Sequence, residues 1–430
     1  KDPAAAFNYT SRGNLVGVIT NGTAVLGLGD IGALASKPVM EGKAVLFKKF
    51  AGVDVFDIEI NEKDPQKLVE VIAALEPTFG AINLEDIKAP DCFYVERELR
   101  KRLNIPVFHD DQHGTAITVA AAMVNALTVA GKKIEEVKLV ASGAGAAALA
   151  CLNLLLVLGL KRENVFVTDL AGVVYEGRAE LMDEDKALFA QKTELRTLAQ
   201  VIEGADVFLG LSAGNVLKKE MVATMAAKPI IFALANPTPE ILPEDVKAVR
   251  SDAIIATGRT DYPNQVNNVL CFPYIFRGAL DCGATTITKE MEVAAVHAIA
   301  DLAKAEQSEE VAAAYIGHTL SFGPEYLIPK PFDPRLMLIV APAVAQAAAE
   351  CGVAQRPIAD MAAYREQLKT FVYASGTMMK PIVMAAKKAT KKRVAFAEGE
   401  EERVLRAAQV VIDERIARPT LIGRPSVIAK

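Results

Sequence analysis

The chain has 430 residues, of which 48 are basic and 53 acidic, and its formal net charge is −5. This length predicts two or three domains, and the 51% hydrophobic composition excludes a disordered or collagen-like protein. The charge balance provides no basic field for nucleic acid or for an anionic membrane surface. Five cysteines without CxxC spacing argue against a disulfide scaffold and against a zinc site, so we expect a reducing, cytoplasmic location.

The chain begins at Lys1 without a signal peptide, and we expect it to be a fragment with an upstream part missing. Residues 139–160 carry no charge and are long enough to span a membrane. Glycines near the start of this stretch and Asn153 within it favour a buried strand, turn and helix instead. We therefore predict no membrane span.

The first 130 residues alternate between strand-like and helix-like segments. Residues 14–20 and 23–28 flank Asn21-Gly22, a pattern typical of a β-hairpin. Further strands are predicted at residues 53–60, 81–84 and 106–108, and helices at 65–75, 90–103 and 115–130. This alternation indicates a parallel sheet covered on both faces.

A second series of such units begins near residue 137. Strands are predicted at residues 137–141, 164–168, 206–210, 229–234 and 253–256, and helices at 149–158, 197–202, 221–225 and 243–249. This is the pattern of a doubly wound nucleotide-binding domain. Residues 287–368 read as helical, and the basic run at 387–393 reads as a linker before a new strand (394–397) and helix.

Two glycine-rich segments compete as the dinucleotide-binding turn. Residues 27–32 fit G-x-G-x-x-G to the letter, whereas the other segment has alanine at the third glycine position. That second segment comprises Gly143, Ala144, Gly145, Ala146 and Ala147. Pyrophosphate binding needs a strand before the turn and a helix N-terminus after it, and the second segment has both. We predict that it holds the cofactor, and that residues 27–32 form a structural turn allowing close backbone approach.

The acidic residue expected at the ribose is Asp169, at the end of the next strand. A carboxylate there favours NAD, because it repels the 2′-phosphate of NADP. Arg178 and Lys186 lie downstream, within reach of such a phosphate. These residues alone leave the choice of cofactor open.

Two acidic pairs, Glu85-Asp86 and Asp110-Asp111, each follow a short apolar strand. Carboxyl ends of parallel strands line the ligand crevice of an α/β sheet, and converging carboxylates there would bind Mg²⁺ or Mn²⁺. For either pair alone, exposed turn residues or helix N-caps are the simpler interpretation. Two pairs at equivalent strand ends favour a metal site.

Two further residue types have both a structural and a chemical interpretation. His109 and His113 have the spacing of a helical zinc pair, but the strand end and Gly114 argue against a helix there, and we expect His113 to be packed or to hydrogen-bond locally. Lys43 lies on the apolar side of a predicted helix. It would either extend its head group to water or act as a base with a lowered pKa.

Taken together, these motifs resemble the malic enzyme family, and more narrowly the large bacterial NADP-type members with a phosphotransacetylase-like C-terminal domain. The resemblance is carried by residues 21–32, 38–49, 83–87, 109–115, 397–403 and 421–424. It covers residues 1–370 as the malic enzyme core, and residues from about 378 as the opening of the phosphotransacetylase-like domain.

The resemblance implies roles for individual residues in malate oxidation. Lys43 would contact the substrate and act as general base on the malate hydroxyl, and Asp110 would orient this lysine. Glu85, Asp86 and Asp111 would hold the divalent ion.

Other family positions concern the cofactor and the substrate. The turn at residues 143–147 would hold the pyrophosphate, while Asn236 and Asn268 match asparagines that contact the nicotinamide and the substrate.

The chain departs from the family pattern at two positions. Ala24 stands where animal-type members have a carboxylate-binding arginine, and Tyr9 does not fit the motif of the family's catalytic tyrosine, so we expect the general acid to be absent from this chain.

The resemblance implies oxidative decarboxylation of (S)-malate to pyruvate and CO₂ with NADP, NAD being the alternative cofactor. It also implies a homo-oligomer and acetyl-CoA as an effector. The expected α/β domains are a substrate and metal domain (1–126), a Rossmann-like NAD(P) domain (127–285), a helical segment completing the core (286–377), and a linker with a truncated C-terminal domain (378–430). Two other functions stay open: another NAD-dependent hydroxy-acid dehydrogenase, and a non-catalytic fragment that binds nucleotide and acyl-CoA.

Overall fold

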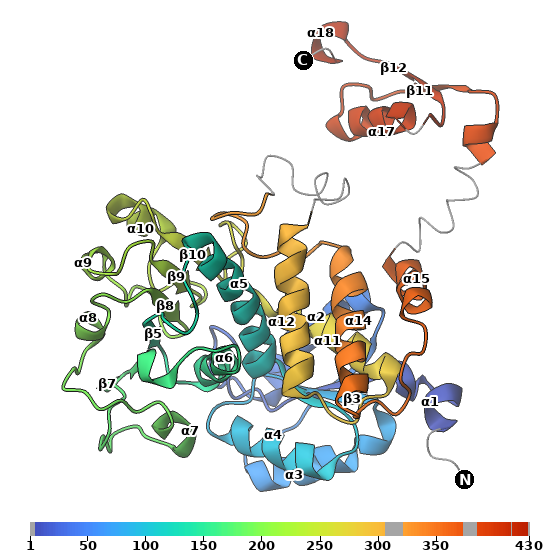
Figure 1. Cartoon of the computed structure of the whole chain (residues 1–430). Coiled ribbons are helices and arrows are strands. Elements are labelled where there is room, and N and C mark those ends of the chain that lie inside the picture. Colours follow the sequence, from blue (N-terminus) through green and yellow to red (C-terminus); the bar gives the residue numbers. More distant parts are fainter. Residues whose placement is uncertain (1–4, 306–320, 373–384, 414, 429–430) are drawn as a thin grey trace. The chain divides into compact units, whose positions relative to one another are not determined.

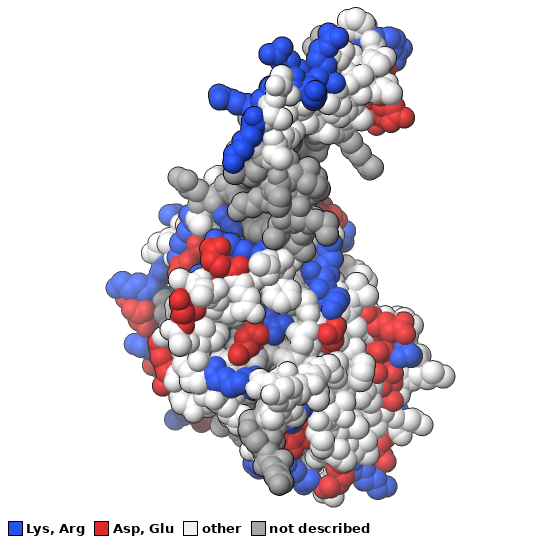
Figure 2. All heavy atoms as spheres, turned by 90° about the vertical axis from the view of Figure 1, so that its right-hand side faces the viewer, with Lys and Arg blue, Asp and Glu red and all other residues white. Residues whose placement is uncertain are grey.

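The structure is a computed structural model that describes residues 5–305, 321–372, 385–413 and 415–428. The chain divides into two compact units, Lys1–Arg365 and Glu366–Lys430. The first unit contains a four-stranded and a six-stranded sheet (Figure 1). On the face of this unit that Figure 2 shows, acidic and basic side chains are interspersed rather than gathered into a field of one sign.

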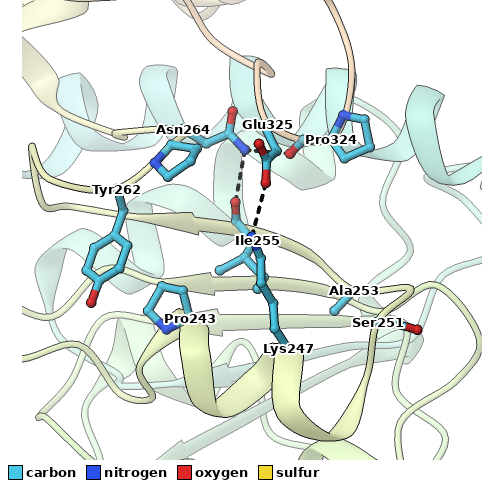
Figure 3. A pocket seen from close by; sticks show the side chains of 10 residues that line it. Pro243, Lys247, Ser251, Ala253, Ile255, Tyr262, Asn264, Pro324 and Glu325 are labelled. Carbon is cyan, nitrogen blue, oxygen red and sulfur yellow. Dashed lines mark hydrogen bonds and ion pairs between the residues drawn. The ribbon is translucent and has the colours of Figure 1, made fainter. Parts of the chain in front are cut away.

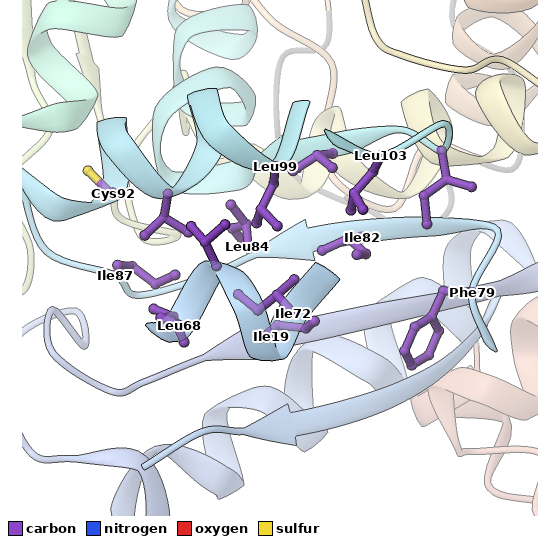
Figure 4. Close-up of a cluster of buried hydrophobic side chains, with 14 of the residues drawn as sticks. Ile19, Leu68, Ile72, Phe79, Ile82, Leu84, Ile87, Cys92, Leu99 and Leu103 are labelled. Carbon is purple, nitrogen blue, oxygen red and sulfur yellow. The ribbon is translucent and has the colours of Figure 1, made fainter. Parts of the chain in front are cut away.

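The four-stranded sheet has the order β2-β1-β3-β4, and its strands are all parallel. Its strands are β1 (Leu15–Thr20), β2 (Asp54–Glu59), β3 (Ala81–Leu84) and β4 (Val107–His109). Its helices are α1 (Ala6–Tyr9), α2 (Ala33–Ala51), α3 (Pro65–Ala74) and α4 (Asp91–Arg102). Residues of β1, β3, α3 and α4 form one buried apolar cluster, which fixes this sheet against its helices (Figure 4).

The predicted hairpin after residue 20 is wrong. β1 pairs in parallel with β2 on one side and with β3 on the other, so it has no free edge for an antiparallel partner. The chain instead turns, and the backbone N–H groups of Thr23 and Ala24 donate to the carbonyl oxygen of Asp86 (3.1 and 3.0 Å). Residues 23–28 therefore lie over the end of β3 rather than beside β1.

The six-stranded sheet has the order β10-β9-β8-β5-β6-β7 and is parallel except for the short β7. Its strands are β5 (Leu139–Ser142), β6 (Val165–Asp169), β7 (Gly172–Val173), β8 (Val207–Gly210), β9 (Ile230–Ala233) and β10 (Ile254–Thr257). The connecting helices are α6 (Ala146–Val157), α7 (Glu184–Ala187), α8 (Leu198–Val201), α9 (Lys219–Ala223) and α10 (Pro243–Val249). The strand order reverses between β5 and β8, which is where ligands bind in a doubly wound sheet.

Long helices complete the first unit. They are α5 (Thr115–Ala130), α11 (Phe272–Cys282), α12 (Lys289–Lys304), α14 (Arg335–Glu350) and α15 (Met361–Val372), the last of which continues into the second unit. Helix α12 packs between α5 and α14 (Figure 1). The stretch Asp110–Ala130 is long and apolar enough to cross a membrane, but 78% of its most apolar window is buried inside the fold, as expected of a core helix.

The second unit contains a short βαβ arrangement. Its strands β11 (Arg393–Phe396) and β12 (Arg418–Leu421) are parallel, and α17 (Glu402–Asp413) connects them. Helix α18 (Pro425–Ile428) follows. The strand and helix predicted after residue 393 are confirmed, with the strand beginning one residue earlier than expected.

Candidate active site

Lys43 is buried at the carboxyl end of the four-stranded sheet. The buried positions of α2 recur every three or four residues, and Lys43 is one of them. Its side chain is 8% exposed, and its Nζ donates to Glu85 Oε1 (3.0 Å) and to Asp110. The Nζ also lies 3.8 Å from the centroid of the Phe272 ring. The head group is thus directed into the site and not to water.

The charge state of Lys43 differs from the one expected of a free base. Burial by itself lowers the pKa of this lysine, but the charges of Asp110 and Glu85 outweigh burial and raise the pKa above its usual range. Lys43 is therefore held protonated between two carboxylates. A cation bound by Glu85 would offset one of these two attractions and lower the pKa of Lys43 toward its usual range.

Three carboxylates meet where β3 and β4 end. Glu85 and Asp86 follow β3, and Asp111 lies in the turn after β4, so the parallel pairing of the two strands brings them together. Their nearest oxygens all lie within 4.8 Å of one another. The backbone N–H of Asp86, a residue with φ of 53°, donates to Asp111 Oδ2 (2.8 Å). This set of oxygens is suited to a hard divalent cation.

The pKa values of the acids in and beside this cluster all lie above their ordinary range. Burial, followed by repulsion from Asp111 and Glu85, raises the pKa of Asp86 to about 9. Burial, opposed by the charge of Lys43, raises the pKa of Asp110 to about 8. Burial also raises the pKa of Glu85 and of Asp111. A divalent ion would relieve this repulsion, and the donor set therefore fits Mg²⁺ or Mn²⁺.

The turn that carries Asp110 and Asp111 is helical, contrary to the sequence prediction. Residues Asp110–Gly114 form a π-helical turn that continues directly into α5. His113 is packed against acids from other parts of the chain and is not bonded locally: its Nε2 lies 3.0 Å from Glu96 Oε2, and its Nδ1 lies 3.3 Å from Glu292 Oε1. His109 stays in β4 and is fully buried, which lowers its pKa to about 4.

The glycine turn at residues 143–147 lies at the switch point of the six-stranded sheet. Gly143 has φ of +109°, and a Cβ there would lie 2.4 Å from the carbonyl oxygen of Leu211, so only glycine fits. Ala144 lies in the turn, and α6 begins at Ala146, with Gly145 as its N-cap residue. This geometry suits a pyrophosphate at the helix N-terminus.

The first glycine motif is a turn, but close approach does not explain its glycines. Gly29 and Gly32 have φ of +75° and +80°, and a Cβ at either would meet nothing within 4 Å. Their positive φ is the reason for glycine there. Ala24 and Leu26, which come just before this turn, line the cleft described next.

A cleft of about 410 Å³ joins the two sheets. It brings together Asp86, Asp111, Gly145, Ala146, Ala147, Asn236 and Asn268. Asn268 also donates to Asp110 Oδ2 (2.5 Å), which couples the 268 segment to the lysine cluster. The sequence reasoning missed Thr115 and Thr118, which line the cleft one helical turn apart at the start of α5, directly after the acidic turn.

Two cationic side chains donate hydrogen bonds to the carboxylate of Asp169. Arg178 donates to both of its carboxylate oxygens (2.8 and 2.5 Å), and Lys186 donates to Oδ2 (2.9 Å). Burial raises the pKa of Asp169, but these hydrogen bonds outweigh it and lower the pKa below its usual range. The end of β6 thus carries one negative and two positive side chains, and the two cations that the sequence placed downstream of Asp169 pair directly with it.

A separate cavity of about 300 Å³ lies between α10, β10 and the segment around Pro324 (Figure 3). Asn264 donates to the carbonyl oxygens of Ile255 and Pro324 there, and Lys247 pairs with Glu325 (3.0 Å). None of the sequence-predicted site residues lines this cavity.

An acidic cluster beside a buried lysine, next to a cleft that reaches a doubly wound sheet with a glycine turn, is an arrangement typical of oxidoreductases that use a nicotinamide dinucleotide. Residues 4–100 match the family described as malic enzyme, N-terminal domain, and residues 112–315 match malic enzyme, NAD binding domain. Residues 377–430 match phosphate acetyl/butaryl transferase. The chain belongs to the malic enzyme family.

Relatives cover the chain at high identity. It is 67% identical to an NAD-dependent malic enzyme of Rhizobium meliloti over 99% of this chain and 56% of that protein. It is 65% identical to an NADP-dependent malic enzyme of Escherichia coli over 100% of this chain and 56% of the relative. The chain thus spans about half the length of these curated relatives. A crystal structure of malic enzyme from Pyrococcus horikoshii superposes with a TM-score of 0.80 at 42% identity, covering 89% of this chain and 86% of that one.

Proposed function

We propose that the protein catalyses divalent-metal-dependent oxidative decarboxylation of (S)-malate to pyruvate and CO₂ with reduction of NADP. The observation that carries this proposal is the contact of Lys43 with Glu85 and Asp110 beside a carboxylate cluster, two members of which, Asp86 and Asp111, line the cleft that also contains the glycine turn. A base, metal ligands and a hydride acceptor are needed within one substrate length of each other, and the cleft together with the adjoining Lys43 cluster offers a place for each.

In the proposed reaction, Lys43 accepts the proton of the malate C2 hydroxyl after losing its own proton, which it would do once a bound divalent cation offsets the charge of Glu85. Asp110 orients the lysine from one side and is itself held by Asn268. Glu85, Asp86 and Asp111 would hold Mg²⁺ or Mn²⁺, which would supply Lewis-acid polarisation of the substrate oxygens, and the turn at residues 143–147 would hold the dinucleotide, which would supply the hydride acceptor for C2. We assign no general acid, since Tyr9 is 86% exposed.

NADP is the proposed cofactor, and NAD is the alternative. Arg178 and Lys186 leave the end of β6 with one net positive charge, which favours a 2′-phosphate over a bare hydroxyl.

We expect Lys186→Gln to raise the KM for NADP about tenfold, because one charge-assisted hydrogen bond is lost, and to change the KM for NAD less than twofold. Lys192→Gln, at an exposed lysine, serves as the control. Equal effects on the two cofactors would place the 2′-phosphate elsewhere.

Initial rates of the intact protein with (S)-malate, Mn²⁺ and either cofactor, with pyruvate and CO₂ quantified, test the proposed activity. Another hydroxy-acid dehydrogenase would oxidise a different 2-hydroxy acid without releasing CO₂. A non-catalytic fragment would bind NADPH and turn nothing over. The division at residues 126, 285 and 377, a homo-oligomeric state and a cytoplasmic location stay predictions.

The second unit is proposed to make the enzyme responsive to acetyl-CoA. Support comes from the match of residues 377–430 to a family of acyltransferases, and from the βαβ start that these residues form. We expect acetyl-CoA to change malate turnover of the intact protein and to leave a variant ending near residue 370 unaffected. Equal responses of both proteins would place the effector site in the first unit.

A further inference from the structure

Glu240 is a buried carboxylate that the proposed chemistry does not use. It lies in the loop between β9 and α10 and is 0% exposed. Its Oε1 accepts hydrogen bonds from the backbone N–H (2.9 Å) and the hydroxyl (3.3 Å) of Ser212, and its Oε2 accepts from the backbone N–H of Ala235 (3.0 Å). These partners are backbone and hydroxyl groups and not cations, which is unusual for a buried acid.

The partners of Glu240 follow the ends of two neighbouring strands. Ser212 comes two residues after β8, next to Leu211, and Ala235 comes two residues after β9, next to Asn236. Leu211 and Asn236 both line the cleft. One carboxylate therefore ties together the two segments that form this wall of the cofactor site.

A third segment joins the same network. The hydroxyl groups of Ser212 and Ser142 lie 2.9 Å apart, and Ser142 directly precedes the glycine turn. The carbonyl oxygen of Leu211 is the atom that excludes a side chain at Gly143. The position of the 211–212 segment thus sets the space available to the turn.

The fold makes specific room for this carboxylate at a cost in free energy. A Cβ on Gly210 would lie 2.4 Å from the carboxyl carbon of Glu240, so β8 must end in glycine for Glu240 to fit. Burial raises the pKa of Glu240, since removing an unpaired carboxylate from water is unfavourable. An apolar side chain would avoid this cost, but it could not accept N–H groups from two separate loops.

We propose that Glu240 is the positioning residue for the nicotinamide half of the cofactor, because it holds Leu211 and Asn236 through the N–H groups beside them. The proposal rests on the proposed function and deepens it. The adenosine half is expected at the end of β6, where Arg178 and Lys186 bond to Asp169 and, within the described part of the chain, none of the three is hydrogen-bonded to this network. Loss of Glu240 should therefore weaken binding of the nicotinamide half of the cofactor and leave binding of the adenosine half unchanged.

The test compares NADPH with adenosine 2′,5′-bisphosphate, which lacks the nicotinamide, as ligands of the intact protein. Glu240→Gln turns one acceptor into a donor facing an N–H group, and we expect the Kd for NADPH to rise about tenfold. The Kd for the bisphosphate should change less than twofold, and kcat with malate should fall. Gly210→Ala keeps the carboxylate but displaces it, and should reproduce the same selective loss.

Asp333→Asn is the matched control. Asp333 is also a buried carboxylate; it precedes α14 and pairs with Arg335, the first residue of that helix. It should leave both dissociation constants unchanged, and thermal unfolding of every variant checks folding. If the Glu240 and Gly210 variants lost affinity for NADPH and for the bisphosphate to the same extent, Glu240 would have a merely structural role and the proposal would be overturned. Unchanged NADPH affinity in these variants would overturn it as well. A wild-type protein that binds NADPH but does not oxidise malate would instead contradict the proposed function.

Discussion

Lys43→Ala is expected to lower kcat for malate oxidation by ~10²–10⁴, the range for loss of a positioned general base. The side chain is buried and bonded to Glu85 and Asp110, so no solvent-exposed group can substitute for it. NADPH affinity should change little, because the glycine turn belongs to the other sheet. Steady-state kinetics with malate, together with NADPH binding by fluorescence, measure the two quantities separately.

Lys48→Ala is the control on the same helix. Lys48 lies five residues further along α2, its side chain is 64% exposed, and it pairs with Asp54 at the surface. Its loss should leave kcat within twofold, as expected for an exposed ion pair. Near-wild-type turnover of Lys43→Ala in the intact protein would show that the lysine only neutralises the acidic cluster.

Asp111→Asn is expected to weaken Mn²⁺ binding by at least ~10- to 100-fold, which is the loss seen even for groups that only support a metal ligand. Malate turnover should fall with it, while NADPH binding should persist. The asparagine keeps an oxygen for the N–H of Asp86 but removes one charge from three oxygens that lie within 4.8 Å of one another. Calorimetric titration with Mn²⁺ and with NADPH separates the effects, and Asp301→Asn, an exposed acid on α12, is the control.

The same substitution should stabilise the metal-free protein, with an effect that depends on pH. The pKa values of Asp86 and Asp110, about 9 and about 8 in the folded state, lie above those of unfolded aspartate. The folded state therefore binds more protons, and stability falls as pH rises from about 4 to about 9, by at most ~1.4 kcal/mol per pH unit for each group.

Thermal unfolding between pH 6 and 9 in the presence of a chelator measures this slope. Mn²⁺ should flatten it, because the ion takes the place of the protons, and Asp111→Asn should reduce it by removing a repelling charge. A metal-free protein whose melting temperature rises over this range would contradict the assignment of mutually repelling acids.

Local patterns in the sequence were sufficient for most of the secondary structure and for the composition of the site. The short apolar run before Glu85-Asp86 and the one before Asp110-Asp111 are both strands, and the apolar stretch after residue 138 is a strand, turn and helix. These features depend on periodicity and on neighbouring residues, which a sequence displays directly. The acids at the strand ends followed from the rule that carboxyl ends of parallel strands share one edge.

Other features depended on strand order, which no local pattern carries. Asn21-Gly22 is a residue pair typical of hairpin turns, yet β1 is a central strand with both edges already paired. The chain after this turn therefore does not form an antiparallel strand beside β1. The sequence placed Arg178 and Lys186 within reach of a 2′-phosphate near Asp169, but only the fold shows that both pair with this acid directly. In each case a local preference was overridden by partners that the tertiary structure supplies.

The sequence by itself determined which groups can carry the chemistry: a lysine on an apolar helix face, two acidic pairs after strands, and a glycine turn before a helix. The tertiary structure alone decided their charge states and their contacts. Lys43 meets acids that lie 42 and 67 residues away, and their charges raise its pKa where burial alone would lower it. Coulomb energy depends on distance in space and on the local dielectric, and both exist only after the chain has folded.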